Sequence, residues 1–446
     1  MLKGKGDVLA MMVGTLLIGL SGYLFLALIG RGRFDATTTA ALSATYLLAN
    51  VLGPGIFIAV EQETSRLVSD AIARGEAAAS GARRLLGIDG GLMLLTLLVL
   101  GALAPVLLSR VLGGDVGLIV ALAISVVGSA AVYFVRGTSG GQRRFRRYAL
   151  TVLIDGATRI AGCVGLVVIG STNPVAFGVV LCAGPAVAAL VTARGSGAPA
   201  IGIVRTPPAI SQLARDVCWL LIASALWMIM QNLAPVVVTA MIPEDPVTAA
   251  GFAGAVVLTR VPLLFMGTIQ ALLLPGMTAA AAAGDAVGLR RTVSRGLTVI
   301  GGIGTLAIIG TALFGRWAVN ILFGADRDTT QTWGLVWLTA SAVIFMAVQL
   351  LQPALVALRR HRALVGAWVA GAVAFSASFA LPVSALDCGL IAQIAGPLVT
   401  LFVQLGVLSG YLRRRRARAA GTGATTPEAL AVEARQPTAL GENPGL

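Results

Sequence analysis

The sequence predicts an all-α membrane protein with about twelve transmembrane helices, arranged as two six-helix parallel repeats around a central cavity. Three observations lead to this prediction: the composition, the spacing of the apolar segments and an internal repeat. Of the 446 residues, 57% are hydrophobic and 12% are charged, and the mean hydropathy is +0.90. Because soluble domains contain about 25% charged residues, this composition indicates a polytopic membrane protein.

About twelve apolar segments are long enough to cross a bilayer. A transmembrane helix needs about 20 apolar residues to span a hydrocarbon core of ~30 Å, and in lipid it satisfies all of its own backbone groups. The first segment has no small-residue cleavage site, so we expect it to remain as an anchor. The segments centre on residues 8–30, 38–60, 87–109, 116–135, 148–170, 174–193, 217–241, 247–275, 297–318, 332–357, 363–384 and 388–411.

The basic residues predict the orientation. Lys and Arg concentrate on alternate short loops, beginning with Lys3 and Lys5 and ending with the run at 413–416. This bias predicts a multi-pass protein of the plasma membrane with both termini in the cytoplasm. The net charge of +14 is then mostly topogenic. Nucleic acid is not an expected partner, because it would need the arginines gathered on one soluble face.

The cysteines indicate no metal or disulfide chemistry. They lie in or at apolar segments, without the spacing of a zinc site or a disulfide framework. We expect Cys163, Cys182, Cys218 and Cys388 to be small buried side chains, and we expect neither a metal nor another cofactor.

The chain resembles itself across its two halves. Residues 73–115 are similar to residues 282–326, and nearly the same offset aligns Pro54 with Pro262. Each half contains six spans, an even number, so the two halves enter the membrane in the same direction as parallel repeats. The predicted organisation is an N-terminal half (1–193), a Gly- and Pro-rich cytoplasmic linker (194–216), a C-terminal half (217–412) and a basic stop followed by a disordered tail (413–446).

Two segments of this layout are similar to those of a known family. The turn into the fifth span reads RGTSGGQRRFRRYALTVLIDGATRIAG, and the eighth span, TRVPLLFMGTIQALLLPGMT, contains prolines. Together with the six-plus-six layout over residues 7–412, these segments resemble the oligosaccharide-lipid (Wzx-type) flippases. That polysaccharide transporter family belongs to the multidrug/oligosaccharidyl-lipid/polysaccharide exporter superfamily. Lipid II flippases resemble the chain too, but they typically carry two further spans.

The resemblance implies a function. In these families a cationic central cavity is thought to take the pyrophosphate of a polyprenyl-linked sugar and to alternate between the two sides of the membrane. By this resemblance, the chain would translocate a polyprenyl-(pyro)phosphate-linked oligosaccharide or a related cell-envelope glycolipid from the inner to the outer leaflet. Its expected partners are that lipid-linked sugar, the phospholipid bilayer, and glycosyltransferases or a polymerase of the same pathway.

Two arginines lie deep in the predicted spans. Arg159 is about eleven residues into the fifth span, or roughly 16 Å at ~1.5 Å per residue, and Arg260 is near the middle of the eighth. A charge at the bilayer centre costs at least ~2.5 to 3.5 kcal/mol unless it is paired or hydrated. Because guanidinium groups bind phosphate oxygens bidentately, both arginines are candidate ligands for an anionic head group.

Asp155 leaves the role of Arg159 open. It lies four residues before Arg159 on the same helix face, so a buried ion pair also explains the pattern. Arg260 has no acidic residue within a helical turn, which favours a ligand or a wet cavity. Asp155 is also a candidate proton or sodium site, although a neighbouring arginine lowers the affinity of a carboxylate for protons.

Polar residues in and beside the spans supply the other candidates. Neutral side chains deep in the membrane hydrogen-bond either the sugars of a substrate or neighbouring helices; the candidates are Asn50, Gln231, Asn232, Gln270, Gln349 and Gln352. Glu61 and Glu63 fall at the cytoplasmic end of the second span near Arg66, either as a solvated cluster or as a gate.

The basic turn before the fifth span is the candidate cytoplasmic entrance. It contains Arg143, Arg144, Arg146 and Arg147. These arginines either gather anionic head groups at the membrane surface or only set the topology. Segments 62–86 and 276–296 are predicted to be amphipathic helices that lie on the inner leaflet.

Three rival functions make different demands on the sequence. A cation-coupled multidrug exporter of the same superfamily would favour acids in its cavity, whereas the deepest charges here are arginines. A membrane glycosyltransferase would need a sizeable outer loop with paired acids, and the chain has short outer loops and no nucleophile elbow, phosphate loop or metal motif. In a scaffold without transport, the cavity would be packed shut. We therefore expect a transporter and not an enzyme.

Overall fold

The computed structural model describes residues 2–30, 33–73, 79–193, 209–266, 285–323, 331–358 and 360–422, and the single positions 273, 277 and 280. Every regular element within these residues is helical, so the predicted fold class is confirmed. Within the described residues, each of the twelve predicted spans coincides with a helix or with a pair of consecutive helices. Most of 267–275, the end of the eighth predicted span, lies outside these residues. Ten of the described helices are long and apolar enough to cross a membrane, and the shorter apolar helices Leu17–Gly30 and Arg362–Ser378 coincide with the first and eleventh predicted spans.

The first six spans contain seven helices. They are α1 (Leu2–Gly30), α2 (Ala36–Leu52), α3 (Pro54–Ala73), α4 (Ala79–Arg110), α5 (Val116–Gly141), α6 (Phe145–Val168) and α7 (Pro174–Thr192). The remaining elements are α8 (Ile210–Met241), α9 (Pro246–Leu258), the 3-10 helix η1 (Val261–Phe265), α11 (Ala286–Phe323), α12 (Thr332–Ala357), α13 (His361–Ser378) and α14 (Ala385–Thr422).

The prolines that the repeat aligns interrupt their spans in both halves. The second span breaks at Gly53, and Pro54 occupies the first position of α3, where its missing N–H costs no helical hydrogen bond. The eighth span breaks after α9, where Pro262 lies in the short 3-10 helix η1. Each half therefore contains one span whose axis is interrupted near its middle.

Several predicted boundaries were wrong, because the helices run beyond their apolar segments. Residues 62–73 continue α3, and 79–86 begin α4, so segment 62–86 is not one separate surface helix. Residues 286–296 likewise begin α11; most of 276–284 lies outside the described residues, as do 194–208 of the linker and 423–446 of the tail. Helix α8 begins at Ile210, within the predicted linker, and α14 continues through the basic run to Thr422.

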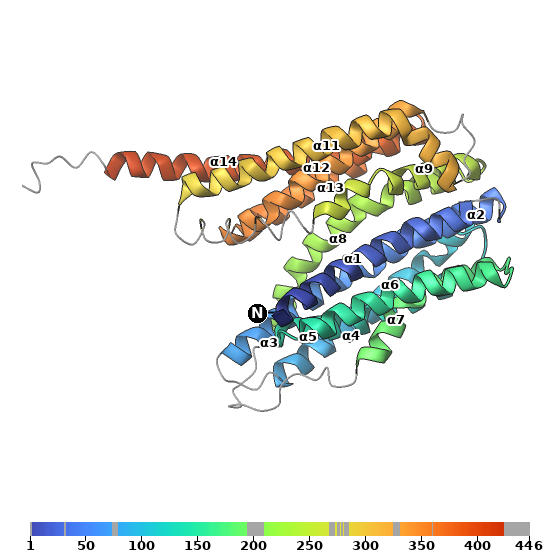
Figure 1. Ribbon diagram of the computed structural model, residues 1–446, viewed down its shortest axis with the longest axis horizontal. Coiled ribbons are helices and arrows are strands. Elements are labelled where there is room, and N and C mark those ends of the chain that lie inside the picture. The colour runs from blue at the N-terminus through green and yellow to red at the C-terminus, as the bar shows by residue number, and fades with distance from the viewer. Residues whose placement is uncertain are drawn as a thin grey trace, which may run out of the picture.

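The helices form two groups that approach each other at one end of the bundle. Most helices contact mainly members of their own group, α1 to α7 or α8 to α14. Helices α2, α8 and α9 contact both groups extensively: α2 packs against α8 and α9, and α3 packs against α8. In Figure 1 the two groups lie close together where α2 begins and α9 lies, and they diverge toward the opposite end, where α3 ends and α8 begins. We call the first the outer end and the second the inner end, following the predicted orientation.

The apolar cores differ between these two ends in the same way. One cluster joins both groups at the outer end, with Phe25 and Leu42 from α1 and α2 and Val238 and Phe252 from α8 and α9. Toward the inner end the apolar core splits in two, one cluster around Phe57 and Val126 and the other around Trp368. Burial of apolar surface therefore holds the groups together at the outer end. Toward the inner end, α8 still packs on the first group through Leu213 and Val217, whereas α11 to α14 contribute to the separate cluster around Trp368.

Candidate functional site

A cavity of about 1060 Å³ lies between the two groups at the inner end. Its walls come from α3 of the first group and from α8, α12 and the start of α13 of the second. Along α8 it extends from Asp216 to Trp227, eleven residues or about 16 Å at ~1.5 Å per residue. It thus reaches from the predicted cytoplasmic surface to about half the depth of a ~30 Å hydrocarbon core.

One face of α8 supplies much of the lining. Asp216, Leu220, Ala223 and Trp227 recur at the three- and four-residue spacing of one helix face. Ser224 lies next to this face, and its hydroxyl donates to the Gly55 carbonyl at 2.9 Å, which joins α8 to the start of α3. The cavity wall is therefore held in place by a hydrogen bond between the two groups.

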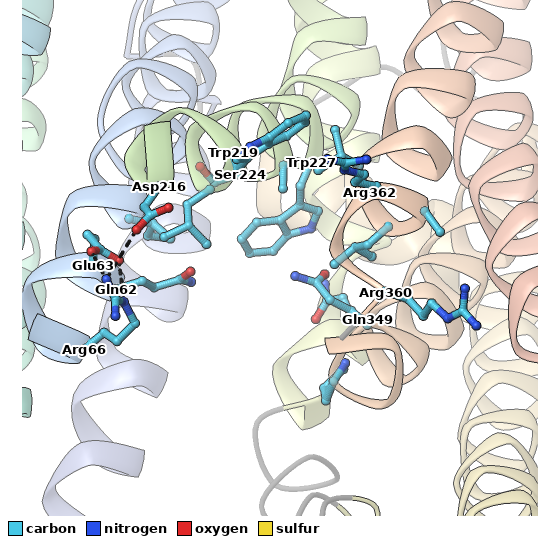
Figure 2. Close-up of a pocket in the computed structure, with 18 residues that line it drawn as sticks. Gln62, Glu63, Arg66, Asp216, Trp219, Ser224, Trp227, Gln349, Arg360 and Arg362 are labelled. Carbon is cyan, nitrogen blue, oxygen red and sulfur yellow. Dashed lines mark hydrogen bonds and ion pairs between the residues drawn. The ribbon is translucent and has the colours of Figure 1, made fainter. Parts of the chain in front are cut away.

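Charge is distributed unevenly around the cavity. Arg66 of α3 donates to Glu63 on its own helix, with Nε 2.8 Å from Oε2, and to Asp216 of α8 at 3.5 Å. Arg360 and Arg362 lie at the start of α13 on the other wall and form no ion pair with any residue in the described part of the chain. Figure 2 shows the carboxylates gathered around Arg66, away from the α13 arginines. The charged groups of the lining that form no ion pair with a described residue are therefore positive.

A second polar region is buried within the first group of helices. Asp155 of α6 is 3% exposed and accepts hydrogen bonds from two arginines. Arg159 donates through Nε to Oδ1 at 2.8 Å, and Arg136 of α5 donates through Nη2 to Oδ2 at 3.1 Å. Gly184 of α7 makes room for this cluster, because a Cβ there would lie 2.5 Å from Asp155 Oδ1. The predicted i, i+4 contact between Asp155 and Arg159 is thus present, and Arg136 is a third member.

Arg136 connects this cluster to α3. Its Nε donates to the Thr151 hydroxyl at 3.0 Å, and its guanidinium lies 5.0 Å from the centre of the Tyr133 ring. Glu61 interacts electrostatically with Arg136 and accepts a hydrogen bond from the Tyr148 hydroxyl at 2.8 Å. Two arginines and two carboxylates therefore balance one another inside this half.

Arg260 of the second group has no such balance. It follows α9, and its Nη1 donates to Asn232 Oδ1 on α8 at 3.1 Å. Its Nη2 is buried without a hydrogen-bond partner, and none of the described residues forms an ion pair with it. The groups that interact with it electrostatically are the hydroxyls of Tyr23 and Tyr46, from α1 and α2. Arg260 therefore lies where the two groups of helices meet.

Tyr46 connects the two deep arginines. It interacts electrostatically with both Arg159 and Arg260. Its hydroxyl packs against Gly22 of α1, where any side chain would collide with it. Both deep arginines are thus within electrostatic reach of one phenol, and neither of them lines the large cavity in this conformation.

The predicted neutral candidates are divided among these regions. Gln349 and Gln352 line the cavity, and Asn232 accepts a hydrogen bond from Arg260. Gln270 lies outside the described residues. Asn50 donates to the Tyr46 carbonyl at 2.9 Å, within its own helix, and the backbone carbonyl of Gln231 accepts from Gln393 at 3.5 Å. Asp155 and Arg159 belong to the balanced cluster.

The predicted entrance arginines also separate. Arg147 donates through Nε to the carbonyl of Thr192 at 3.0 Å, near the end of α7, whereas Arg143, Arg144 and Arg146 are exposed. Arg143 has a φ of 54° and marks the turn between α5 and α6. One of the four arginines therefore stabilises a helix end, and three remain at the surface.

Two predictions about burial need correction. Glu63 is 2% exposed, so it is not part of a solvated cluster as one prediction had it, and its partner Arg66 is half-exposed. Cys218 is exposed, whereas Cys163, Cys182 and Cys388 are buried as predicted. Among the residues that the structure describes, no three His, Cys, Asp or Glu side chains lie close enough together to hold a metal ion.

The sequence also contained signals for residues that were not singled out. Trp227 and Asp216 share the helical spacing described above. Tyr23 and Tyr46 are isolated phenols in the first two spans, and a phenol in lipid needs a polar partner. Arg136 was assigned to a loop, because the glycines that follow it resemble a turn.

No family model matches the chain. Among curated proteins it is similar to the uncharacterized protein Rv1510 of Mycobacterium tuberculosis, with 28% identity over 305 residues. That match spans 65% of each chain, so it covers just under two thirds of the relative's length. The chain is also 26% identical to the uncharacterized protein Mb3654 of Mycobacterium bovis over 407 residues, which cover 91% of this chain and 92% of the relative.

Solved structures with a similar fold are transporters. A multidrug resistance MATE family transporter of the MOP superfamily, in an inward-facing conformation, matches with a TM-score of 0.65 at 14% identity over 90% of this chain and 99% of that chain. The lipid II flippase MurJ, in an inward closed conformation, matches with a TM-score of 0.64 at 10% identity over 91% and 89%. The Vibrio cholerae MATE transporter VcmN matches with a TM-score of 0.63 at 15% identity over 92% and 96%. The fold is therefore shared by a lipid flippase and by multidrug transporters, and the substrate must be argued from the site.

Proposed function

We propose that the protein translocates a polyprenyl-(pyro)phosphate-linked oligosaccharide, or a related cell-envelope glycolipid, from the inner to the outer leaflet of the plasma membrane by alternating access. Within this proposal it is a Wzx-type flippase whose substrate is made and used by glycosyltransferases or a polymerase of the same pathway. Both termini face the cytoplasm, and residues 1–193 and 217–412 act as two moving halves joined by 194–216.

The observation that carries the proposal is the unbalanced charge of Arg260. The Arg260 guanidinium donates to Asn232 and interacts electrostatically with Tyr23 and Tyr46, but no ion pair within the described residues offsets its desolvation cost. A phosphate oxygen would supply the missing acceptor for Nη2, since guanidinium and phosphate form charge-assisted hydrogen bonds. The position between the two groups of helices suits a residue that a moving substrate passes.

The cavity supports the direction of entry. It opens at the inner end, and the shared apolar cluster closes the outer end, as alternating access requires of one of its two end states. Arg360 and Arg362 at its wall attract an anionic head group first, and Arg260 lies beyond its deep end. An inside-negative potential then favours outward movement of each unbalanced negative charge by ~2.3 kcal/mol per 100 mV.

A cation-coupled multidrug exporter is the alternative, because Glu63 and Asp216 line the cavity. Both carboxylates are already engaged by Arg66, and the unpaired charges of the described lining are arginines. A cationic drug would therefore face repulsion from α13 without a free carboxylate to compensate. This electrostatic balance favours the anionic lipid.

A transport assay separates the two functions. The purified protein in proteoliposomes should move a fluorescent polyprenyl-pyrophosphate-linked sugar between leaflets, and it should not accumulate ethidium under a proton or sodium gradient. Ethidium accumulation without movement of the lipid would replace the proposal with the exporter.

Cysteine labelling tests the orientation. A membrane-impermeant maleimide added from outside should label Asp245→Cys and miss Phe145→Cys and Arg360→Cys. The reverse pattern would overturn the topology and, with it, the direction of transport.

A further inference from the structure

We propose that Trp227, Gln62 and Gln349 form a platform that binds the sugar of the substrate, so that the protein selects its lipid by the sugar as well as by the phosphate. This inference rests on the proposed function, because it assigns the sugar-binding part of the same cavity. The three residues come from α8, α3 and α12, and all three line the cavity.

The side chains converge on one space. In Figure 2, Gln62 and Gln349 extend toward each other from opposite walls of the cavity, and the indole of Trp227 lies between those walls. Along α3 the neighbours of Gln62 are engaged elsewhere: Glu61 accepts from Tyr148, and Glu63 accepts from Arg66. Gln62 is exposed, and its side chain makes no hydrogen bond with any described residue.

This set of groups matches the surface of a sugar ring. A pyranose presents a face of C–H groups, which an aromatic ring covers, and a rim of hydroxyls that both donate and accept hydrogen bonds. The indole supplies a flat apolar face, and each glutamine amide supplies two donors and an acceptor with two lone pairs. Gln352, one helical turn after Gln349, also lines the cavity and offers a further amide.

The platform is fixed before any substrate arrives. Ser224, one turn before Trp227, donates to the Gly55 carbonyl at 2.9 Å. Helix α8 approaches α3 so closely here that a Cβ at Gly55 would lie 3.0 Å from Met228 Cβ. A preorganised aromatic wall loses little freedom on binding, which favours recognition of a defined sugar face.

Other occupants fit the same lining less well. An acyl or prenyl chain that covered Gln62 would offer its amide no hydrogen-bond partner, and an amide taken from water without a hydrogen bond is costly. A cationic drug could stack on Trp227, but the carboxylates of the described lining are paired with Arg66, while Arg360 and Arg362 form no ion pair with a described residue. At about 1060 Å³ the cavity is at the upper end of the ~300 to 1,000 Å³ of small-molecule sites, as an oligosaccharide head group requires.

The platform lies next to the deep arginine. Asn232, which binds Arg260, follows Trp227 by five residues on α8, or about 7.5 Å at ~1.5 Å per residue. A sugar on the platform therefore stays close to the residue that takes its phosphate during transit. Sugar and phosphate recognition should be separable by mutation.

The test is a binding measurement on the full-length protein in nanodiscs. The probes are a polyprenyl pyrophosphate and the same lipid carrying glucose, galactose or N-acetylglucosamine. The quantity compared is the ratio of dissociation constants without and with the sugar. For the wild type we expect a ratio of about tenfold or more for at least one sugar, as expected for one or two well-made hydrogen bonds and a stacked ring.

The variants separate the platform from the rest of the site. Trp227→Ala should bring the ratio close to one while changing the affinity for the bare lipid by less than about twofold. Trp227→Phe should retain most of the ratio, and Gln62→Ala, at an exposed position that does not support the fold, should lower it partly. The matched control is Trp337→Ala on α12, because Trp337 is 54% exposed and does not line the cavity.

The outcomes distinguish this inference from the proposed function. A wild type that binds the bare lipid and every sugar-bearing lipid equally would overturn the platform and leave the flippase proposal standing. A Trp227→Ala variant that weakens both kinds of lipid to the same extent would also overturn it. A wild type that binds none of the four lipids would contradict the proposed function itself.

Discussion

The two halves of the bundle treat a deep arginine in opposite ways. In the first half, Arg136 and Arg159 share the carboxylate of Asp155, and Glu61 lies within electrostatic reach of Arg136. In the second half, Arg260 donates to Asn232 and interacts electrostatically with Tyr23 and Tyr46, and it forms no ion pair with a described residue. Among the described residues, the deep arginines of the first half thus have carboxylate partners, whereas Arg260 of the second half has none.

The difference separates a structural cation from a functional one. A buried ion pair does not by itself add stability, but removal of one partner is costly because the other charge stays buried. An unpaired cation carries its desolvation cost permanently, and that cost falls only when an anion arrives. We therefore expect mutations in the first half to act mainly on stability and mutations at Arg260 to act mainly on transport.

The largest effect is expected at Asp155. Asp155→Ala leaves Arg159 without its carboxylate and Arg136 with Glu61 alone, and should lower the free energy of unfolding by about 3 to 5 kcal/mol. Thermal unfolding in detergent, followed by loss of monodisperse protein, measures this. Asp89→Asn is the matched control, because Asp89 is 3% exposed and its Oδ1 has no hydrogen-bond partner among the described residues. Equal destabilisation by both variants would remove the special role of the cluster.

Arg260→Ala should have the opposite profile. It should lower the rate of lipid-linked sugar transport by about 10- to 100-fold, since hydrogen bonds to charged groups contribute ~1.5 to 3 kcal/mol. Its stability should change by less than ~1 kcal/mol, because the lost Asn232 contact is offset by removal of an uncompensated charge. Arg260→Lys should recover transport only in part, because the planar fork is lost. A variant that transports normally would exclude Arg260 from the substrate path.

A smaller effect is expected where a glycine accommodates the balanced cluster. Gly184→Ala places a Cβ 2.5 Å from Asp155 Oδ1 and 2.9 Å from Arg159 Nε, and such overpacking costs about 1 to 3 kcal/mol. Gly165→Ala on α6 is the control, because a Cβ there meets nothing within 4 Å. Thermal unfolding should separate the two variants, and equal melting temperatures would show that the cluster tolerates displacement.

The smallest effect is expected at a feature that the two halves share. Asp35 and Asp245 cap α2 and α9, and each accepts a hydrogen bond from the backbone three residues ahead. The hydrogen bonds from Thr38 and Thr248 lower the pKa of these carboxyls below the ordinary 3.8. Because the folded pKa is the lower one, the stabilisation is complete above the unfolded pKa and is lost as the pH falls through the folded pKa.

Cap removal should therefore show a pH dependence. Asp35→Ala and Asp245→Ala should each cost about 0.5 to 2 kcal/mol at neutral pH. The difference in the free energy of unfolding between each variant and the wild type should shrink below pH 4. Thermal unfolding over a pH series measures this difference. A difference that is constant with pH would mean that the carboxylate charge plays no part in these caps.

The spans were predicted well from the sequence, because their length and apolarity can be read directly from it. In lipid, a segment of that length satisfies its backbone N–H and C=O groups by forming a helix. The predicted end of the fourth span, at residue 135, was wrong, because the glycines that follow Arg136 suggested a loop. Gly137 and Gly141 instead lie against α3, where a Cβ would come within 2.7 Å of Glu61 O and 2.8 Å of Ser65 O. Helix α5 therefore continues through Arg136, and the turn is at Arg143.

The candidate site was predicted less completely than the fold. The contact between Asp155 and Arg159 follows from helical spacing within one segment, and so it could be predicted. The contact of Arg260 with Asn232 and the approach of Tyr46 to both deep arginines depend on how separate helices pack. No pattern within one span encodes those distances. For the same reason, the cavity face of α8 became evident only once its neighbours were in place.

The most direct test of the central claim varies the substrate charge and Arg260 together. Two lipids with the same prenyl chain and sugar, one joined through pyrophosphate and the other through a neutral linkage, are compared for translocation by the wild type and Arg260→Ala in inverted vesicles. We expect the wild type to prefer the pyrophosphate lipid by about tenfold or more, and the variant to lose that preference. A variant that keeps the preference, or that slows both lipids equally, would show that Arg260 does not recognise the phosphate.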